Sequence, residues 1–151
     1  MMLNNMKNFN QYITEKIKLS NDRFNNQHNG FEYVDLELPS GNMWAVTNIG
    51  ADKETDFGDY FAWGETEPKQ CYDEYSMLIL DKFQEGLKSS GVVDSNLNLT
   101  AAYDAATVNW GKDWRMPTRA EMEELRNNCT WTWTTLNGTS GYLVCSKSNG
   151  N

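Results

Sequence analysis

The length, composition and charge of the chain restrict the classes of protein to which it can belong. Its 151 residues are enough for one ordinary domain and a short additional segment. The mean hydropathy is −0.70, and no apolar run approaches the roughly 20 residues that span a bilayer, so insertion into a membrane is excluded. Aromatic residues form 13% of the chain and include 6 tryptophans, which argues against wholesale disorder.

Charge is unevenly distributed along the sequence. Residues 1–30 hold four basic and two acidic side chains, whereas the rest of the chain holds nine basic and nineteen acidic ones, and the formal net charge is −8. An acidic body of this kind repels phosphate backbones, so nucleic acid is excluded as a partner. The expected partners are therefore proteins or glycans.

The first part of the chain has the apolar spacing of a helix. Apolar side chains recur at intervals of three and four between residues 6 and 20, which predicts an amphipathic helix within an N-terminal segment of residues 1–24. Such a helix is marginal by itself in water, so its apolar face should pack on the body, on a second copy in a homo-oligomer, or on another protein. The residues of this docking face are Phe9, Tyr12, Ile13 and Ile17. Residues 25–30 are polar and predict a linker.

Targeting and redox signals are few. Asparagine and glutamine interrupt every apolar run near the N-terminus, so we find no secretion signal. Three cysteines are an odd number, which favours a reducing compartment over a disulfide framework. Cys129 and Cys145 could face each other across a hairpin, but free buried thiols are the favoured interpretation.

The first half of the body predicts a hairpin followed by irregular structure. Residues 34–38 alternate between apolar and acidic side chains, residues 39–42 have turn composition, and residues 43–46 predict the returning strand. Residues 58–65 predict a short aromatic strand between glycines. Residues 66–100 predict a surface excursion, in which residues 77–87 favour a helix.

Local signals are strongest in the second half. Asp104 and the residues after it favour a helical turn, and Thr118 and Glu121 have the spacing of a capping box, which predicts a helix from there to about Asn128. Threonine and tryptophan then alternate over residues 130–134, and an Asn-Gly pair precedes residues 142–144. This pattern predicts a second β-hairpin.

Several blocks of the sequence resemble a known family. The blocks are residues 33–41, Trp44-Ala45 with residues 48–51, residues 58–65, residues 104–106, and Asn109-Trp110-Gly111 with residues 114–118. In this order they resemble the Fibrobacter succinogenes major paralogous domain, which is similar in turn to the C-type lectin-like fold of the formylglycine-generating enzyme. The resemblance spans about residues 31–151 and includes Trp114-Arg115-Met116-Pro117-Thr118 at the start of the predicted helix.

The resemblance implies an α+β, C-type lectin-like domain with small antiparallel sheets and two helices, preceded by the N-terminal helix. The family pattern continues into further strands beyond the position of Asn151. We therefore expect a domain over residues 31–151 that is naturally short, is a fragment, or is completed by strands of another chain. In each case its exposed strand edges should bind a partner.

The residue types needed for catalysis are sparse. The only histidine, His28, lies in the expected linker, so a hydrolase triad would lack its base, and we expect no enzyme. The acidic residues between positions 31 and 67 could attract calcium, but most of them are explained as outward strand positions and a solvated loop. We therefore expect no metal and no cofactor.

The tryptophans are the strongest binding candidates. Trp44, Trp63 and Trp110 lie inside the family blocks and are expected in the core. Arg115 is expected to form an internal pair with a carboxylate such as Asp59 or Glu65. A second set, Trp131, Trp133 and Tyr142, forms the tentative ligand site. Trp131 and Trp133 share one face of a strand, which either binds a ligand or is buried, and burial is the favoured interpretation.

These observations predict a noncatalytic binding or structural module. The family resemblance and the missing secretion signal favour a phage virion component, such as a fibre, decoration or adhesin subunit that recognises host protein or glycan. Its expected location is the virion, or the bacterial cytoplasm before assembly. The alternatives are a degenerate relative of the formylglycine-generating enzyme and a purely architectural virion subunit.

Overall fold

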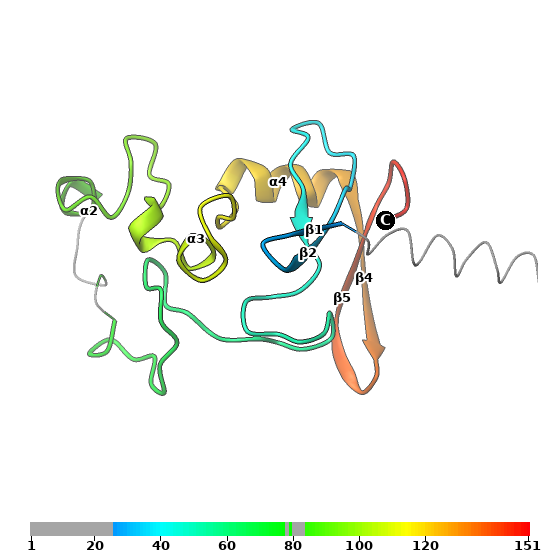
Figure 1. The fold of residues 1–151 in the computed structure, drawn as a ribbon, viewed down its shortest axis with the longest axis horizontal. Helices are drawn as coiled ribbons and strands as arrows, with labels where there is room; N and C mark the ends of the chain where they lie inside the picture. Colours follow the sequence, from blue (N-terminus) through cyan, green and yellow to red (C-terminus); the bar gives the residue numbers. More distant parts are fainter. Residues whose placement is uncertain (1–25, 78, 80–83) are drawn as a thin grey trace, which may run out of the picture.

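A computed structural model describes residues 26–77, 79 and 84–151 (Figure 1). The expected N-terminal helix, with Phe9, Tyr12, Ile13 and Ile17, lies outside the described residues. Within them, the protein combines two small antiparallel sheets with a few short helices. The mixed α/β class expected from the sequence is thus confirmed.

The first sheet has three short antiparallel strands. Its order is β1 (Gln27–His28), β2 (Phe31–Val34) and β3 (Trp44–Ala45). Asn29 and Gly30 both have positive φ, 54° and 84°, and form the tight turn between β1 and β2. Residues 27–30 of the expected linker therefore form β1 and its turn. The Asn29-Gly30 pair is a strong hairpin signal, but the polar composition around it is also typical of a linker.

The hairpin expected over residues 34–46 forms only in part. Its first strand is β2, which ends at Val34 and does not extend over residues 34–38 as expected, and it pairs with the shorter returning strand β3. After β2 the carboxylate of Asp35 accepts a hydrogen bond from Glu37 N at 2.7 Å, and Glu37 has a positive φ of 49°. This local turn ends the strand. Leu36 and Leu38, on either side of Glu37, are nevertheless buried. The alternation of apolar and acidic residues therefore reflects two buried leucines at a bend and not a continuous strand.

The middle of the chain is irregular. Among the described residues from 46 to 79 there is no helix or strand, so the expectation of an aromatic strand over residues 58–65 is wrong. Asp59 N instead donates to Ile49 O at 2.7 Å and closes a loop. Gly58 has a φ of 69°, and a Cβ atom there would lie 2.3 Å from Ile49 O, so this close approach of two backbone segments requires glycine.

The helices follow in the second half. The helix expected over residues 77–87 is confirmed only for residues 84–87, which begin α2 (Gln84–Ser89), because residues 77 and 79 are not helical. A single 3₁₀ turn (Ala101–Tyr103) precedes α3 (Ala105–Trp110), and α4 spans Arg119–Asn128. Both predicted helix starts are confirmed.

The start of α3 is joined to the segment before α4 by one buried carboxylate. Asp104, only 3% exposed, accepts a hydrogen bond from Thr107 N at 2.9 Å and another from Met116 N at 2.8 Å. It therefore caps the helix and fixes the chain that leads to α4.

The main hydrophobic cluster lies where α4 meets the second sheet. Its buried members are Leu36, Leu38, Leu125 and Cys129, with Val34, Trp44 and Val144 packed around them. The second sheet follows α4 directly, and its two strands run away from the helix as a ribbon (Figure 1). Only the base of this ribbon therefore contributes to the cluster.

Candidate functional site

The C-terminal hairpin forms from strong local signals. β4 (Cys129–Leu136) and β5 (Thr139–Ser146) pair along their full length, with Cys129 opposite Ser146. Alternating threonine and tryptophan favour an extended strand. Asn137 and Gly138 have φ values of 51° and 86°, as the two central residues of a primed hairpin turn require. The predicted hairpin is confirmed.

One face of the hairpin carries three aromatic rings. Trp131 and Trp133 are two residues apart and share a face, and Tyr142 lies opposite Trp133. The Tyr142 ring centroid is 6.0 Å from that of Trp131 and 5.0 Å from that of Trp133, with interplanar angles of 73° and 76°. Edge-to-face pairs of this kind are mutually stabilising. We call Trp131, Trp133 and Tyr142 the aromatic face.

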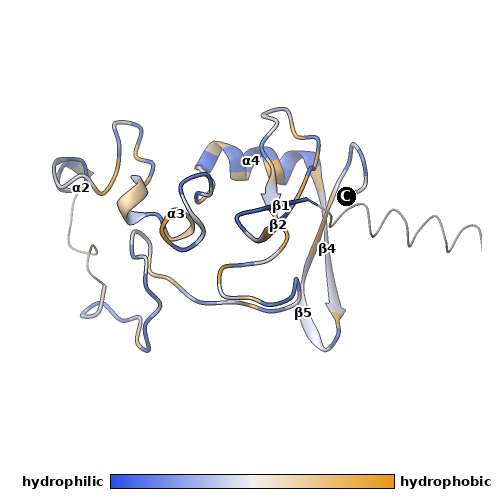
Figure 2. Cartoon of the chain, viewed as in Figure 1, coloured by the Kyte–Doolittle hydropathy of each residue, from blue (hydrophilic) through white to orange (hydrophobic). Residues whose placement is uncertain are grey.

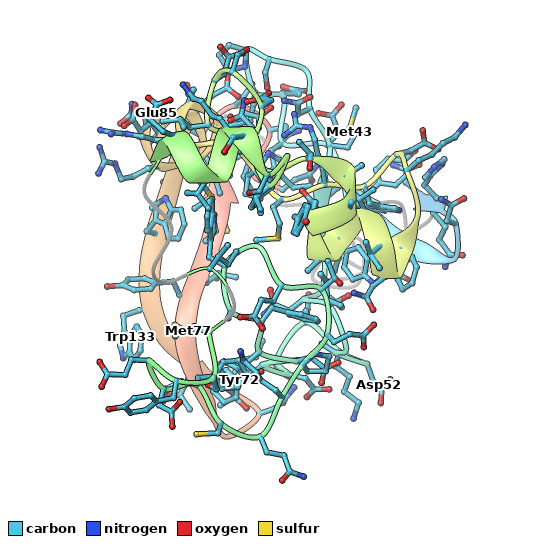
Figure 3. The ribbon with its side chains drawn as sticks, turned by 90° about the vertical axis from the view of Figure 1, so that its left-hand side faces the viewer. Met43, Asp52, Tyr72, Met77, Glu85 and Trp133 are labelled. Atoms are coloured by element: carbon cyan, nitrogen blue, oxygen red, sulfur yellow. The ribbon has the colours of Figure 1, made fainter. Side chains whose placement is uncertain are left out.

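The aromatic face is exposed. The exposed fractions are 37% for Trp131, 63% for Trp133 and 62% for Tyr142, and Trp133 lies on the outer side of the ribbon in Figure 3. The favoured expectation that these tryptophans are in the core is therefore wrong. The physical reason is that the ribbon leaves the body after its first residues, so only Cys129 and Ser146 at its base are buried.

The hairpin differs from the rest of the protein in charge. Residues 129–146 contain no acidic, basic or histidine residue and include seven threonines and serines, in a chain of net charge −8. Figure 2 shows this ribbon largely in the pale colours of intermediate hydropathy. A partner can therefore cover the aromatic face without desolvating a charge.

The base of the hairpin is anchored to the loop after β2. The buried hydroxyl of Ser146 donates a hydrogen bond to Leu36 O at 2.6 Å. The side-chain amides of Asn149 and Asn151 both donate to Asp35 O, at 3.0 and 2.9 Å. These bonds fix the direction in which the ribbon projects, and residue spacing gives no sign of them.

The tryptophans expected in the core divide into two groups. Trp110 is 8% exposed and Trp44 is partly buried against the main cluster, which agrees with expectation. Trp63 is 55% exposed, so its assignment to the core is wrong. Its neighbour Gly64 is buried instead, and a Cβ atom there would lie 2.2 Å from Ile79 Cδ1. The backbone of this turn thus faces the interior and the indole faces outward.

Arg115 has a different partner from the one expected. Its guanidinium binds both carboxylate oxygens of Glu121, with Nη1 2.7 Å from Oε2. The expected pair with a carboxylate therefore forms, but its partner is neither Asp59 nor Glu65. Glu65 pairs with Lys69 at 2.7 Å. Glu121 also accepts a hydrogen bond from Thr118 N at 2.8 Å, so the capping box turns its side chain back towards Arg115.

A cavity of about 640 Å³ lies between β3 and the segment that joins α3 to α4. Trp44, Trp110 and Trp114 line it, and the buried Trp44 Nε1 has no hydrogen-bond partner among the described residues. His28, in β1 rather than in a linker, also borders it, with Nε2 3.0 Å from Asp113 Oδ2. No serine or cysteine is among the residues that line this cavity, and no spacing in the sequence indicates it.

The C-terminal hairpin holds two of the three cysteines. Cys129 lies opposite Ser146, and Cys145 lies opposite Thr130, so their side chains project from opposite faces of the ribbon and the alternative of a cross-strand disulfide is wrong. All three cysteines are free, and burial raises the pKa of Cys129.

Over the described ranges, no three His, Cys, Asp or Glu side chains gather as a metal site. No helix in the same ranges combines the length and apolar character needed to cross a membrane.

Comparison with known proteins adds no relative. No family model, no curated protein and no solved structure matches the chain. The resemblance to the Fibrobacter succinogenes major paralogous domain therefore stays a prediction from the sequence blocks.

Proposed function

We propose that the protein is a noncatalytic recognition module that binds neutral host glycans through its aromatic face. The observation that carries this proposal is the exposure of Trp131, Trp133 and Tyr142 together on one uncharged ribbon. Large exposed aromatic rings are costly to leave in water, and they are over-represented where proteins bind ligands.

The chemistry of the ribbon suits a saccharide. The apolar C–H face of a sugar ring can pack on an indole or phenol ring, and the two T-shaped contacts of Tyr142 hold the three rings in one arrangement before a ligand arrives. Such preorganisation reduces the entropy lost on binding. The threonine and serine hydroxyls of the ribbon can donate to or accept from sugar hydroxyls.

The sequence blocks support a wider context for this site. They favour a C-type lectin-like fold over residues 31–151, and a role as a fibre, decoration or adhesin subunit of a phage virion. The segment of residues 1–24, through Phe9, Tyr12, Ile13 and Ile17, would then attach the module to a protein partner or to further copies of itself.

A glycan array with the full chain tests the proposal. We expect Trp133→Ala to reduce binding at least about tenfold, because the most exposed ring of the pair is lost. Trp131→Ala should reduce binding less, since Trp131 is more covered. Trp63→Ala is the matched control, because it removes a similarly exposed indole outside the hairpin and should leave binding unchanged.

Two outcomes would contradict this function. Wild-type protein that binds no glycan but forms a tight homo-oligomer would indicate an architectural subunit. Wild-type protein that binds host proteins in a Trp133-dependent manner, with a silent array, would assign the aromatic face to protein recognition. Thermal unfolding of each variant shows whether a loss of binding reflects a loss of fold.

A further inference from the structure

The outer edge of β5 is unpaired. In the described part of the chain β5 pairs only with β4, and no other described segment makes a hydrogen bond to the backbone of residues 139–145. An edge of this kind presents N–H and C=O groups at regular intervals to any strand that approaches it. Nothing lies within 4 Å of the position that a Cβ atom on Gly141 would occupy, so one face of the strand is also uncovered at its centre.

A groove follows this edge. A cavity of about 550 Å³ is lined on one side by residues 139–145 and on the other by β3 and residues 54–57. The two strands cross in Figure 1, and in the lower half of the ribbon β5 lies between β4 and the first sheet, so its free edge faces the body there. Tyr142 of the aromatic face lines the groove, whereas Trp131 and Trp133 do not, so the two surfaces adjoin at Tyr142.

The groove has uncovered apolar walls. Leu136 and Leu143 of the hairpin are 47% and 51% exposed, and Phe57 on the opposite wall is 63% exposed. Contiguous exposed apolar side chains of this size mark interaction surfaces. An extended chain between the walls would cover these side chains and pair with the strand edge at the same time.

The charge of the groove selects between occupants. Glu54 and Asp56 stand on the wall opposite β5, and no lysine, arginine or histidine is among the lining residues. A second copy of the chain would bring its own net charge of −8 to this acidic wall and be repelled. A basic segment would be attracted.

We propose that the groove binds an extended basic peptide segment of a partner protein, which adds to β5 as a third strand. Residues 139–145 span roughly 20 Å at about 3.3 Å per residue, which suits a segment of about six or seven residues. Apolar side chains of the segment would contact Leu143 and Phe57, and its lysines or arginines would face Glu54 and Asp56. This partner is additional to the glycan of the proposed function.

The test uses the full chain and a capped seven-residue peptide in which valine alternates with lysine. We expect binding by fluorescence titration, and increased hydrogen-exchange protection of those backbone amides of residues 139–145 that point away from β4. The double variant Glu54→Lys/Asp56→Lys should weaken binding about tenfold and reduce its salt dependence. Asp52→Lys/Glu67→Lys is the matched control, since these exposed carboxylates lie outside the groove, and should weaken binding much less.

A second peptide tests strand pairing directly. The same peptide with every amide N-methylated has lost its backbone donors, and we expect its affinity to fall at least about tenfold. Equal binding of the two peptides, or unchanged exchange at residues 139–145, would overturn the proposal. So would protection, in the free protein, of the amides of residues 139–145 that point away from β4. Protection that depends on protein concentration would indicate a second copy, and protection that does not would indicate residues 1–25. Trp133→Ala should bind the peptide normally, because Trp133 does not line the groove.

Discussion

Arg115 and Glu121 form a bidentate ion pair, in which both guanidinium Nη atoms are bonded to the carboxylate. Arg115 precedes α4, and Glu121 lies in its first turn. The carboxylate simultaneously closes the capping box with Thr118. Chiefly because of the Arg115 hydrogen bonds, and with a further contribution from the Thr118 N–H, the pKa of Glu121 is lowered to about 2 although partial burial opposes this.

This ion pair predicts a specific pH dependence of stability. A carboxyl group whose folded-state pKa is lowered contributes stability that is complete above its unfolded-state pKa, ordinarily 4.5, and is lost as the pH falls towards about 2. Glu121→Gln should lower the free energy of unfolding at neutral pH by about 2 kcal/mol. It should also flatten the decline of stability between these two pH values. Urea unfolding followed by tryptophan fluorescence measures both effects.

Glu123→Gln provides the control for that experiment. Glu123 pairs with Arg119, whose side chain is 92% exposed, and exposed pairs of this kind contribute less than about 1 kcal/mol. A Glu121→Gln variant with the acid sensitivity of the wild type would contradict the importance of the Arg115 contact.

Asp104 should be among the most sensitive polar positions. Asp104→Ala removes the acceptor of two backbone N–H groups, on Thr107 and Met116, and should cost about 2–3 kcal/mol in thermal unfolding. Asp104→Asn keeps one oxygen acceptor and should cost less. Asp94→Ala is the control, because Asp94 also accepts from two backbone N–H groups but is exposed. An equal loss of stability in Asp94→Ala and Asp104→Ala would show that burial does not cause the sensitivity of Asp104.

Ser146 should control the base of the hairpin. Ser146→Ala leaves the buried Leu36 carbonyl without its donor, which should cost about 1–2 kcal/mol and reduce the exchange protection of the first β4 amides. Ser140→Ala removes an exposed hydroxyl near the tip and should have little effect. Equal protection in the two variants would rule out the anchoring role of Ser146.

The exposed thiol should react at a rate set by its neighbour. The hydrogen bond from Cys71 Sγ to Asp73, and the negative charge of that carboxylate, raise the pKa of Cys71. Asp73→Asn should therefore increase the thiolate fraction and the rate of labelling by a disulfide reagent at about pH 8. Cys129 is 2% exposed and should stay unlabelled in the folded protein. If Asp73→Asn left the labelling rate of Cys71 unchanged, the effect assigned to the Asp73 carboxylate would be contradicted.

Short-range signals predicted the second half of the fold well. The capping box at Thr118, the cap at Asp104 and the Asn-Gly turn of the C-terminal hairpin each act over about four residues or fewer, so their geometry is encoded locally. The same signal at Asn29 and Gly30 was present in the sequence, but the surrounding polar composition favoured a linker, and the strand depends on pairing with β2.

Long-range packing decided the rest, including the candidate site. Parity alone places Trp131 and Trp133 on one side of β4, but the side that meets water depends on where the ribbon leaves the hydrophobic cluster and on the bonds from Ser146 and Asn149 to the loop after β2. The groove beside β5 likewise exists only because residues 54–57 and β3 come to lie opposite it. Local propensity specifies single elements, whereas exposure arises between elements distant in the chain, because burial is a property of how they pack together.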